Sequence, residues 1–119
     1  MEDRVLFKRH RRLRSSSAMR SLVRETSLQV DDFIYPMFVI EGENKKIEVP
    51  SMPGVFQLSI DQLKAEMQAL YDLGIKAVML FGVPLEKDEQ GTGAFISEGI
   101  VQEATREIKN SFSDMLVIA

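Results

Sequence analysis

The sequence predicts an α/β protein in which parallel strands alternate with helices. Three continuous apolar runs begin near residues 33, 76 and 115, as expected for strands buried on both faces of a parallel sheet. The two segments between these runs carry apolar residues at helical spacing. Each strand–helix unit takes about 40 residues, so eight units would need on the order of 300, which is usual for a (β/α)₈ barrel. A doubly wound sheet begins in the same way, but we favour the first three βα units of a TIM barrel, preceded by an extended N-terminal arm.

Residues 1–30 are predicted to form a basic arm with a short helix. Residues 1–24 hold eight basic and two acidic groups, a balance of +6, whereas residues 25–119 hold seven basic and sixteen acidic groups, a balance of −9. Ser16 or Ser17 can cap a helix that runs to about Thr26. A basic arm on an acidic body predicts a negatively charged partner for the arm.

Residues 31–119 are predicted to form the incomplete barrel. The first strand covers residues 32–40, with Pro36 tolerated where no neighbouring strand needs its N–H. Residues 41–58 are expected to be a long loop. A helix then begins with a capping box of Ser59 and Gln62, and it ends at Gly74, which suits a left-handed C-cap.

The second strand covers residues 77–81 and leads into a polar loop that extends through Gly93. Ser97 is expected to cap the second helix, whose apolar face consists of Ile100, Val101, Ala104 and Ile108. The sequence then ends on the apolar run at 115–119. Because chemistry in α/β proteins lies on loops beyond such strands, we expect the chain to be the opening portion of an enzyme.

The most conspicuous motif is the basic run at residues 9–14. Arg9, Arg11, Arg12 and Arg14 could contact phosphates or carboxylates through bidentate guanidinium groups. No aromatic residues are interleaved and no nucleic-acid-binding motif lies nearby, so contact with a neighbouring subunit is favoured over nucleic acid binding, and a solvated charge run is the third interpretation. His10, the single histidine, is expected at the surface.

The loop at residues 85–93 carries three carboxylates but lacks the phosphate-binding fingerprints GxGxxG and Walker A. A solvated mobile loop is favoured over acid/base chemistry, although the loop follows the active end of a strand. Phe81 either packs in the core or lines a substrate pocket. No metal-ligand cluster and no desolvated lysine is predicted, and the sequence contains no cysteine, secretory signal or membrane-length apolar stretch.

Several segments together resemble the porphobilinogen synthase family, also called 5-aminolevulinate dehydratase, in the family's order and spacing. They cover nearly the whole chain: RHRRLR at 9–14, VRET at 23–26, DDFIYPMFV at 31–39, SMPGV at 51–55, DLGIKAVMLFGVP at 72–84, KDEQGTGA at 87–94 and the final LVIA.

The resemblance implies a (β/α)₈ barrel whose N-terminal arm wraps a neighbouring subunit in a homo-octamer. It implies a cytoplasmic lyase of haem biosynthesis that condenses two 5-aminolevulinate molecules to porphobilinogen through two Schiff-base lysines, assisted by zinc or magnesium. Those lysines and metal ligands match no residue of this chain, so the fragment alone is expected to be inactive, with no catalytic or metal-binding residue. Arg9, Arg11, Arg12 and Arg14 match the arm motif, and Phe81 matches a residue near the substrate pocket. A stand-alone α/β binding module with a nucleic-acid-binding arm is the alternative.

Overall fold

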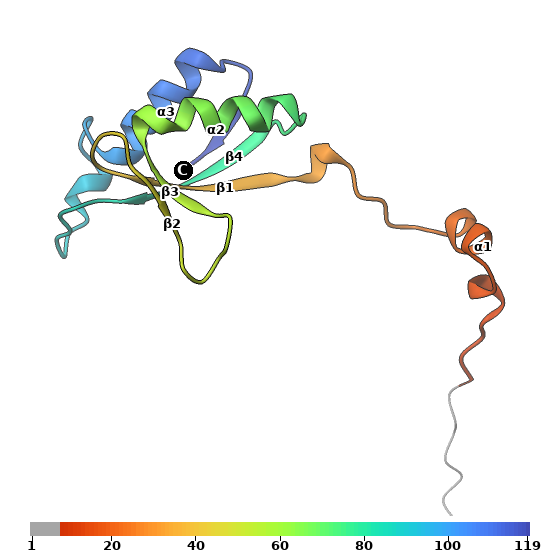
Figure 1. Cartoon of the computed structure of the whole chain (residues 1–119). Coiled ribbons are helices and arrows are strands. Elements are labelled where there is room, and N and C mark those ends of the chain that lie inside the picture. Colours follow the sequence, from red (N-terminus) through yellow and green to blue (C-terminus); the bar gives the residue numbers. More distant parts are fainter. Residues whose placement is uncertain (1–7) are drawn as a thin grey trace, which may run out of the picture.

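The structure, a computed structural model, describes residues 8–119 and consists of an α/β body with an arm projecting from it (Figure 1). The body contains a five-stranded sheet in the order β2-β3-β1-β4-β5. Helices α2 and α3 both cover the same face of this sheet (Figure 1). The elements are η1 (Arg12–Arg14), α1 (Ser17–Leu22), η2 (Val30–Asp32), β1 (Ile34–Ile40), β2 (Lys46–Glu48), β3 (Phe56–Ser59), α2 (Ile60–Asp72), β4 (Ala77–Val83), η3 (Thr92–Ala94), α3 (Ile100–Ser111) and β5 (Leu116–Ile118).

The parallel arrangement predicted for the three long apolar runs is confirmed. Strand β1 pairs in parallel with β4 along its whole length, from Ile34 opposite Ala77 to Ile40 opposite Val83. Strand β4 in turn pairs in parallel with β5. Helix α2 precedes β4 and α3 precedes β5, so each helix is the crossover between two parallel strands.

The prediction of a long loop at residues 41–58 is wrong. This segment contains β2 and β3, which pair with each other in antiparallel fashion, and β3 also pairs in parallel with the carboxyl half of β1. Phe56 and Leu58 turn toward the core. These strands have only three and four residues, so each is too short to show a recognisable alternation of apolar and polar residues in the sequence.

Helix α2 begins after Ser59, as predicted, but the predicted capping box is wrong. The Ser59 side chain makes no cap hydrogen bond, because its oxygen accepts from the Lys45 N–H (2.9 Å) and its hydroxyl contacts Asp61. The C-terminal prediction is confirmed: Gly74 is left-handed (φ +83°), and the Ile75 N–H donates to the carbonyl of Leu70 (3.1 Å).

Helix α3 begins at Ile100, and its N-cap is Gly99 rather than the predicted Ser97. The Ser97 hydroxyl instead donates to Glu98 (2.6 Å), and its carbonyl accepts from Arg106 (2.6 Å). The predicted apolar face of α3 packs on the sheet. The buried core consists of Met37, Val39, Leu58, Leu63, Met67, Leu70, Val78, Leu80, Ile100, Ala104, Ile108, Phe112 and Met115.

Most of the opposite face of the sheet is left open by the described chain, although Ile40 and Ser59, near the ends of β1 and β3, are buried on it (8% and 0% exposed). Ile34, Ala77 and Leu116 are laterally paired and share this face, as do Phe38 and Phe81. Leu116 is 58% exposed, because this face has no covering layer over β5 within residues 8–119. Parallel sheets are ordinarily covered on both faces, which makes this apolar surface unusual.

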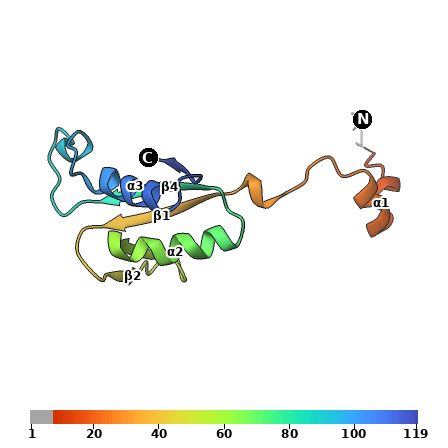
Figure 2. The same cartoon turned by 90° about the horizontal axis from the view of Figure 1, so that it is seen from above.

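The arm lies apart from the body and ends in α1 (Figure 2). The radius of gyration is 22.1 Å, whereas about 13.5 Å is expected for a compact chain of this length. Ser16 caps α1 by accepting from the Met19 N–H (3.1 Å), as predicted, but the helix ends at Leu22 rather than near Thr26. Residues 1–7 of the predicted arm lie outside the described residues. None of the described helices combines the length and apolar character needed to span a bilayer.

Candidate functional site

The carboxyl ends of β1, β4 and β5 meet at one edge of the sheet, where they border an open hollow of about 1210 Å³. Glu41 follows β1, Pro84 follows β4 and Ala119 follows β5, and all three line the hollow. The loop at residues 85–99 and the first turns of α3 form the rest of its wall. In α/β folds this edge is where catalytic and binding loops lie, which makes the hollow the candidate site.

The carboxylates of this loop are exposed, and Asp88 shapes the turn around it. Its side chain accepts from the backbone N–H of Thr92 (2.8 Å), while its carbonyl accepts from Gly91, which is left-handed (φ +65°). Hydrogen bonds from the Thr92 side chain and then from its backbone lower the pKa of Asp88. A carboxylate held in its ionised form by a turn is a poor general acid, and the preference for a solvated loop over acid/base chemistry stays a prediction.

Two side chains of α3 hold the end of the loop. Gln102 donates to the carbonyl of Ala94 (2.8 Å), and Arg106 donates to that of Ser97 (2.6 Å). The hydrogen bond from the Ser97 hydroxyl, followed more weakly by the charge of Arg106, lowers the pKa of Glu98. The sequence analysis predicted a solvated mobile loop. The structure confirms that residues 85–93 are exposed. It also shows that hydrogen bonds from Gln102 and Arg106 join the end of the loop to α3.

Gly82 sets the distance between β4 and α3 at the hollow. A Cβ atom at this position would lie 2.6 Å from Val101 Cγ2 and 2.8 Å from Ile100 Cγ2. These distances are well inside van der Waals contact, so only glycine lets the start of α3 approach the strand this closely.

Phe81 lies on the uncovered face of the sheet rather than in the hollow. It is 45% exposed, and its ring packs against that of Phe38 with 5.6 Å between the centroids. The structure therefore places Phe81 outside the core beneath the helices. Its predicted role in lining a substrate pocket stays a prediction.

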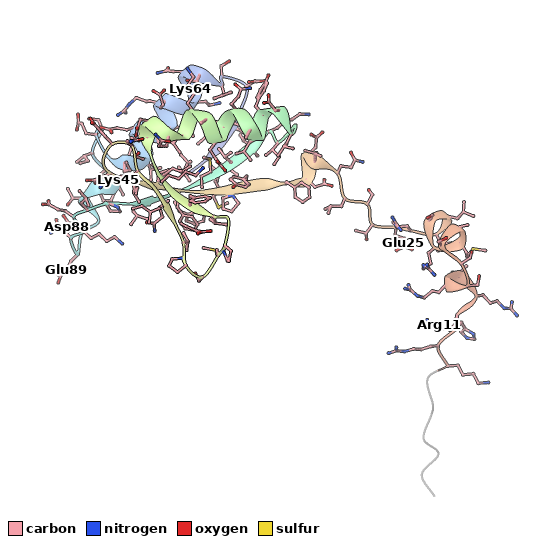
Figure 3. The ribbon with its side chains drawn as sticks, in the orientation of Figure 1. Arg11, Glu25, Lys45, Lys64, Asp88 and Glu89 are labelled. Carbon is pink, nitrogen blue, oxygen red and sulfur yellow. The ribbon has the colours of Figure 1, made fainter. Side chains whose placement is uncertain are left out.

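The arm residues Arg9, Arg11, Arg12 and Arg14 are all exposed, as is His10. Figure 3 places Arg11 at the opposite end of the molecule from Asp88 and Glu89. The only ion pair among residues 8–119 joins Lys76 to Asp31 (3.0 Å). No arginine of the described arm is therefore neutralised by a carboxylate of residues 8–119.

The described lysines are all exposed: Lys8, Lys45, Lys46, Lys64, Lys76, Lys87 and Lys109. None has the desolvated surroundings that favour a neutral, nucleophilic amine. Residues 8–119 also contain no cluster of three or more histidine, aspartate or glutamate side chains able to hold a metal ion. Residues 8–119 therefore contain neither a buried lysine for Schiff-base formation nor a cluster of side chains for binding a metal ion.

Glu41, Gln102 and Arg106 are among the residues that line the hollow without having been predicted as site residues. Glu41 could have been found from its position directly after the first strand. No sequence signal distinguishes Gln102 and Arg106 from the other polar residues of α3, because their role depends on how the loop folds back on the helix.

The chain is similar over nearly its whole length to one set of known proteins. A family model described as "Delta-aminolevulinic acid dehydratase" matches residues 7–119. A protein of that name from Halalkalibacterium halodurans is 56% identical over 119 residues, which cover 100% of this chain and 36% of the relative. One from Staphylococcus aureus is 51% identical over 113 residues, which cover 95% of this chain and 35% of the relative.

A solved structure has the same fold. The crystal structure of delta-aminolevulinic acid dehydratase (porphobilinogen synthase) from Toxoplasma gondii ME49, in complex with the reaction product porphobilinogen, matches with a TM-score of 0.79 and 32% identity. The match covers 95% of this chain and 32% of that chain. The chain thus spans about a third of the length of the curated relatives it matches.

Proposed function

The chain belongs to the delta-aminolevulinic acid dehydratase family, and we propose that it is the N-terminal part of a porphobilinogen synthase. The complete enzyme is a lyase that condenses two molecules of 5-aminolevulinate, with loss of water, to porphobilinogen for haem biosynthesis. The observation that carries this proposal is 56% identity over all 119 residues to a protein of that name. A cytoplasmic location goes with this biosynthetic role.

Within that enzyme, we assign residues 31–119 to the first part of a (β/α)₈ barrel, with β1, β4 and β5 as the first three barrel strands. The parallel pairing of these strands and the two helices on one face support the assignment. In a closed barrel one face of the sheet lies under the helices and the other faces the interior. The uncovered face that carries Phe81 and Leu116 is then the interior face.

Phe81 then belongs to the wall of the substrate pocket. It lies two residues before the carboxyl end of β4, on the face assigned to the barrel interior, and its ring is supported by Phe38. Barrel enzymes bind their substrates at the carboxyl end of the strands. An aromatic ring at this height can exclude water from one side of a bound substrate.

The chain on its own is expected to be inactive. A Schiff-base mechanism requires a lysine that is neutral in the site, and the described lysines all lie in solvent. The family resemblance implies zinc or magnesium, but residues 8–119 do not offer the ligands for either ion. We therefore assign this part of the enzyme to assembly and to the pocket wall, and we derive no catalytic step from it.

Residues 1–30 serve as a subunit-contact arm in a homo-oligomer, with an octamer as the family assembly. Arg9, Arg11, Arg12 and Arg14 are exposed and make no ion pair with the described part of their own chain. Residues 25–119 carry a balance of −9, so a second copy offers the carboxylates that these guanidinium groups require. Nucleic acid is a less favoured partner, since no Phe, Tyr or Trp that could stack on bases is interleaved in the basic run at residues 9–14.

The test is a chimera in which residues 1–119 replace the corresponding segment of the Halalkalibacterium halodurans relative. We expect the chimera to form porphobilinogen from 5-aminolevulinate at a rate within about tenfold of the relative, and residues 1–119 alone to form none. A folded chimera without activity would contradict the proposed enzyme. Turnover by residues 1–119 alone would contradict the assignment of catalysis to other parts of the protein.

A further inference from the structure

Three consecutive serines, Ser15, Ser16 and Ser17, directly follow the basic run of the arm. We propose that this serine cluster is a phosphorylation site for a protein kinase that recognises basic residues, with Ser15 as the main acceptor, and that the phosphate weakens docking of the arm on a second copy. The regulatory part of this inference rests on the proposed role of the arm in subunit contact. The modification itself depends only on the sequence and geometry of the arm.

The arginines are spaced as such a kinase requires. Arg14 precedes Ser15 directly, and Arg12 lies three residues before it, one turn of η1 away, where its carbonyl accepts from the Ser15 N–H (3.4 Å). Planar guanidinium groups bind the carboxylates of an acidic cleft in a bidentate manner. Because Arg12 and Arg14 lie at set positions before Ser15, their binding would place the serine at a defined point in the cleft of the kinase.

The cluster is accessible in the described chain. All three serines are exposed, and they lie on an arm that is separate from the body (Figure 3). Ser15 is the C-cap of η1 (φ −67°, ψ −27°), and the backbone becomes extended at Ser16 (φ −148°, ψ 164°) before α1 begins. A substrate segment must fit an active-site cleft as a single strand, and η1, a single exposed turn outside the body, can open for this without unfolding the body.

Hydrogen bonding sets the Ser16 hydroxyl apart from those of Ser15 and Ser17. Ser16 caps α1 by accepting from the Met19 N–H, so its modification would disturb a contact that stabilises the helix. The Ser15 hydroxyl makes no hydrogen bond within residues 8–119. Ser15 Oγ attacks the γ-phosphorus of a nucleoside triphosphate. As the new O–P bond forms, the bond to the β-phosphate oxygen breaks, the hydroxyl proton passes to a base of the kinase, and the nucleoside diphosphate leaves.

The phosphate lowers the positive charge of the arm, on which its docking depends. It adds a charge of about −1.5 to −2 at pH 7, which lowers the balance of residues 1–24 from +6 to about +4. Its oxygens can also bind Arg12 and Arg14 within the same arm, which removes these groups from the carboxylates of a neighbour. Self-association is expected to weaken on the order of tenfold, the loss of one or two arginine–carboxylate contacts.

The modification is tested with the purified chain, a basic-directed serine/threonine kinase and radiolabelled ATP, with the site mapped by mass spectrometry. We expect one phosphate on Ser15, and an incorporation that falls at least tenfold in Ser15→Ala and in the double variant Arg12→Gln/Arg14→Gln. Ser51→Ala is the matched control, because Ser51 is equally exposed but follows no arginine run. No incorporation, or equal incorporation into the Ser15→Ala and Ser51→Ala proteins, overturns the site.

The regulatory role is tested by sedimentation velocity of the unmodified and phosphorylated chains at low and at physiological salt. Weaker association of the phosphorylated chain, with a smaller dependence on salt, supports it. Equal association of the two forms, or a monomeric unmodified chain, overturns it. Failure of the chimera to make porphobilinogen would leave both the phosphate mapping and the sedimentation result unchanged, so the two proposals fail separately.

Discussion

The absence of a side chain at Gly82 allows the start of α3 to pack directly against β4. The residue lies near the end of a strand rich in large apolar side chains, where glycine is ordinarily unfavourable. The closeness of Val101 and Ile100 explains its presence, because α3 can rest on the strand only where no Cβ intervenes. In the neighbouring loop, the side chains of Asp88 and Glu98 also act on nearby residues, because each accepts a hydrogen bond from a residue within four positions of itself.

Replacement of Gly82 by alanine is expected to destabilise the fold by about 1–3 kcal/mol, the usual cost of forcing an extra methyl group into a packed contact. Urea unfolding of the chimera monitored by circular dichroism measures this change. Gly93→Ala is the matched control, because a Cβ atom at Gly93 meets nothing within 4 Å. Equal unfolding midpoints for the two variants would show that α3 does not pack on Gly82.

The ionisation of Asp88 offers a second test at this scale. Its pKa is lowered in the folded state, first by the Thr92 side chain, so the ionised form stabilises the turn at pH values above the ordinary pKa of aspartate. That stabilisation is lost as the pH falls through the lowered, folded-state pKa. An NMR titration of Thr92→Val should show the Asp88 pKa moving back up toward its ordinary value, because the hydroxyl is gone. Thr105→Val, which removes a hydroxyl bonded to Val101, should leave the Asp88 titration unchanged.

At the scale of the elements, the contacts of Ser59 show why the β2–β3 segment was missed. Ser59 is fully buried, and its oxygen accepts from the Lys45 N–H while its backbone N–H donates to the Lys45 carbonyl (3.0 Å). The serine therefore joins the end of β3 to the segment that enters β2. In the sequence, the same serine indicates only the start of a helix, because Lys45 lies 14 residues away.

Ser59→Ala is expected to cost about 1–3 kcal/mol, because it leaves the Lys45 N–H without its side-chain acceptor in a partly buried position. Protection of the amides of residues 45–48 from hydrogen exchange should fall, whereas the amides of α2 should be little affected. Gln62→Ala is the control, since its side chain bonds only at the surface, to Asn44 and Asp61. A loss of protection confined to the first turn of α2 would instead favour a capping box.

The same contrast explains which elements the sequence could predict. The strands β1, β4 and β5 and the helices α2 and α3 follow from apolar periodicity and from Gly74, all of which act within a few residues. The short strands β2 and β3 and the Gly99 cap depend on contacts with distant segments, such as Lys45 with Ser59. In the candidate site, the loop at 85–99 was located from the end of the second strand, but its attachment to Gln102 and Arg106 was not.

At the scale of the whole molecule, the two exposed surfaces call for different partners. The arm presents arginines that no carboxylate of the described chain neutralises, so it suits an acidic surface of a second copy. The uncovered sheet face presents Ile34, Phe81 and Leu116, and it has no charged residue among the paired positions of β1, β4 and β5. An apolar parallel sheet face requires packing rather than charge pairing, and this matches its assignment to a barrel interior.

The uncovered face leads to the final prediction. Residues 1–119 alone should bind the dye ANS strongly, whereas the active chimera should bind little, because closure of the barrel buries this face. Replacing Ile34 and Leu116 by threonine should lower the ANS fluorescence of residues 1–119 several-fold. The paired control replaces Leu22 and Leu28 of the arm in the same way. These residues are 82% and 74% exposed, and their replacement should change the ANS fluorescence little. Equal dye binding by residues 1–119 and by the chimera would mean that the face stays open in the complete enzyme, which would contradict the barrel assignment.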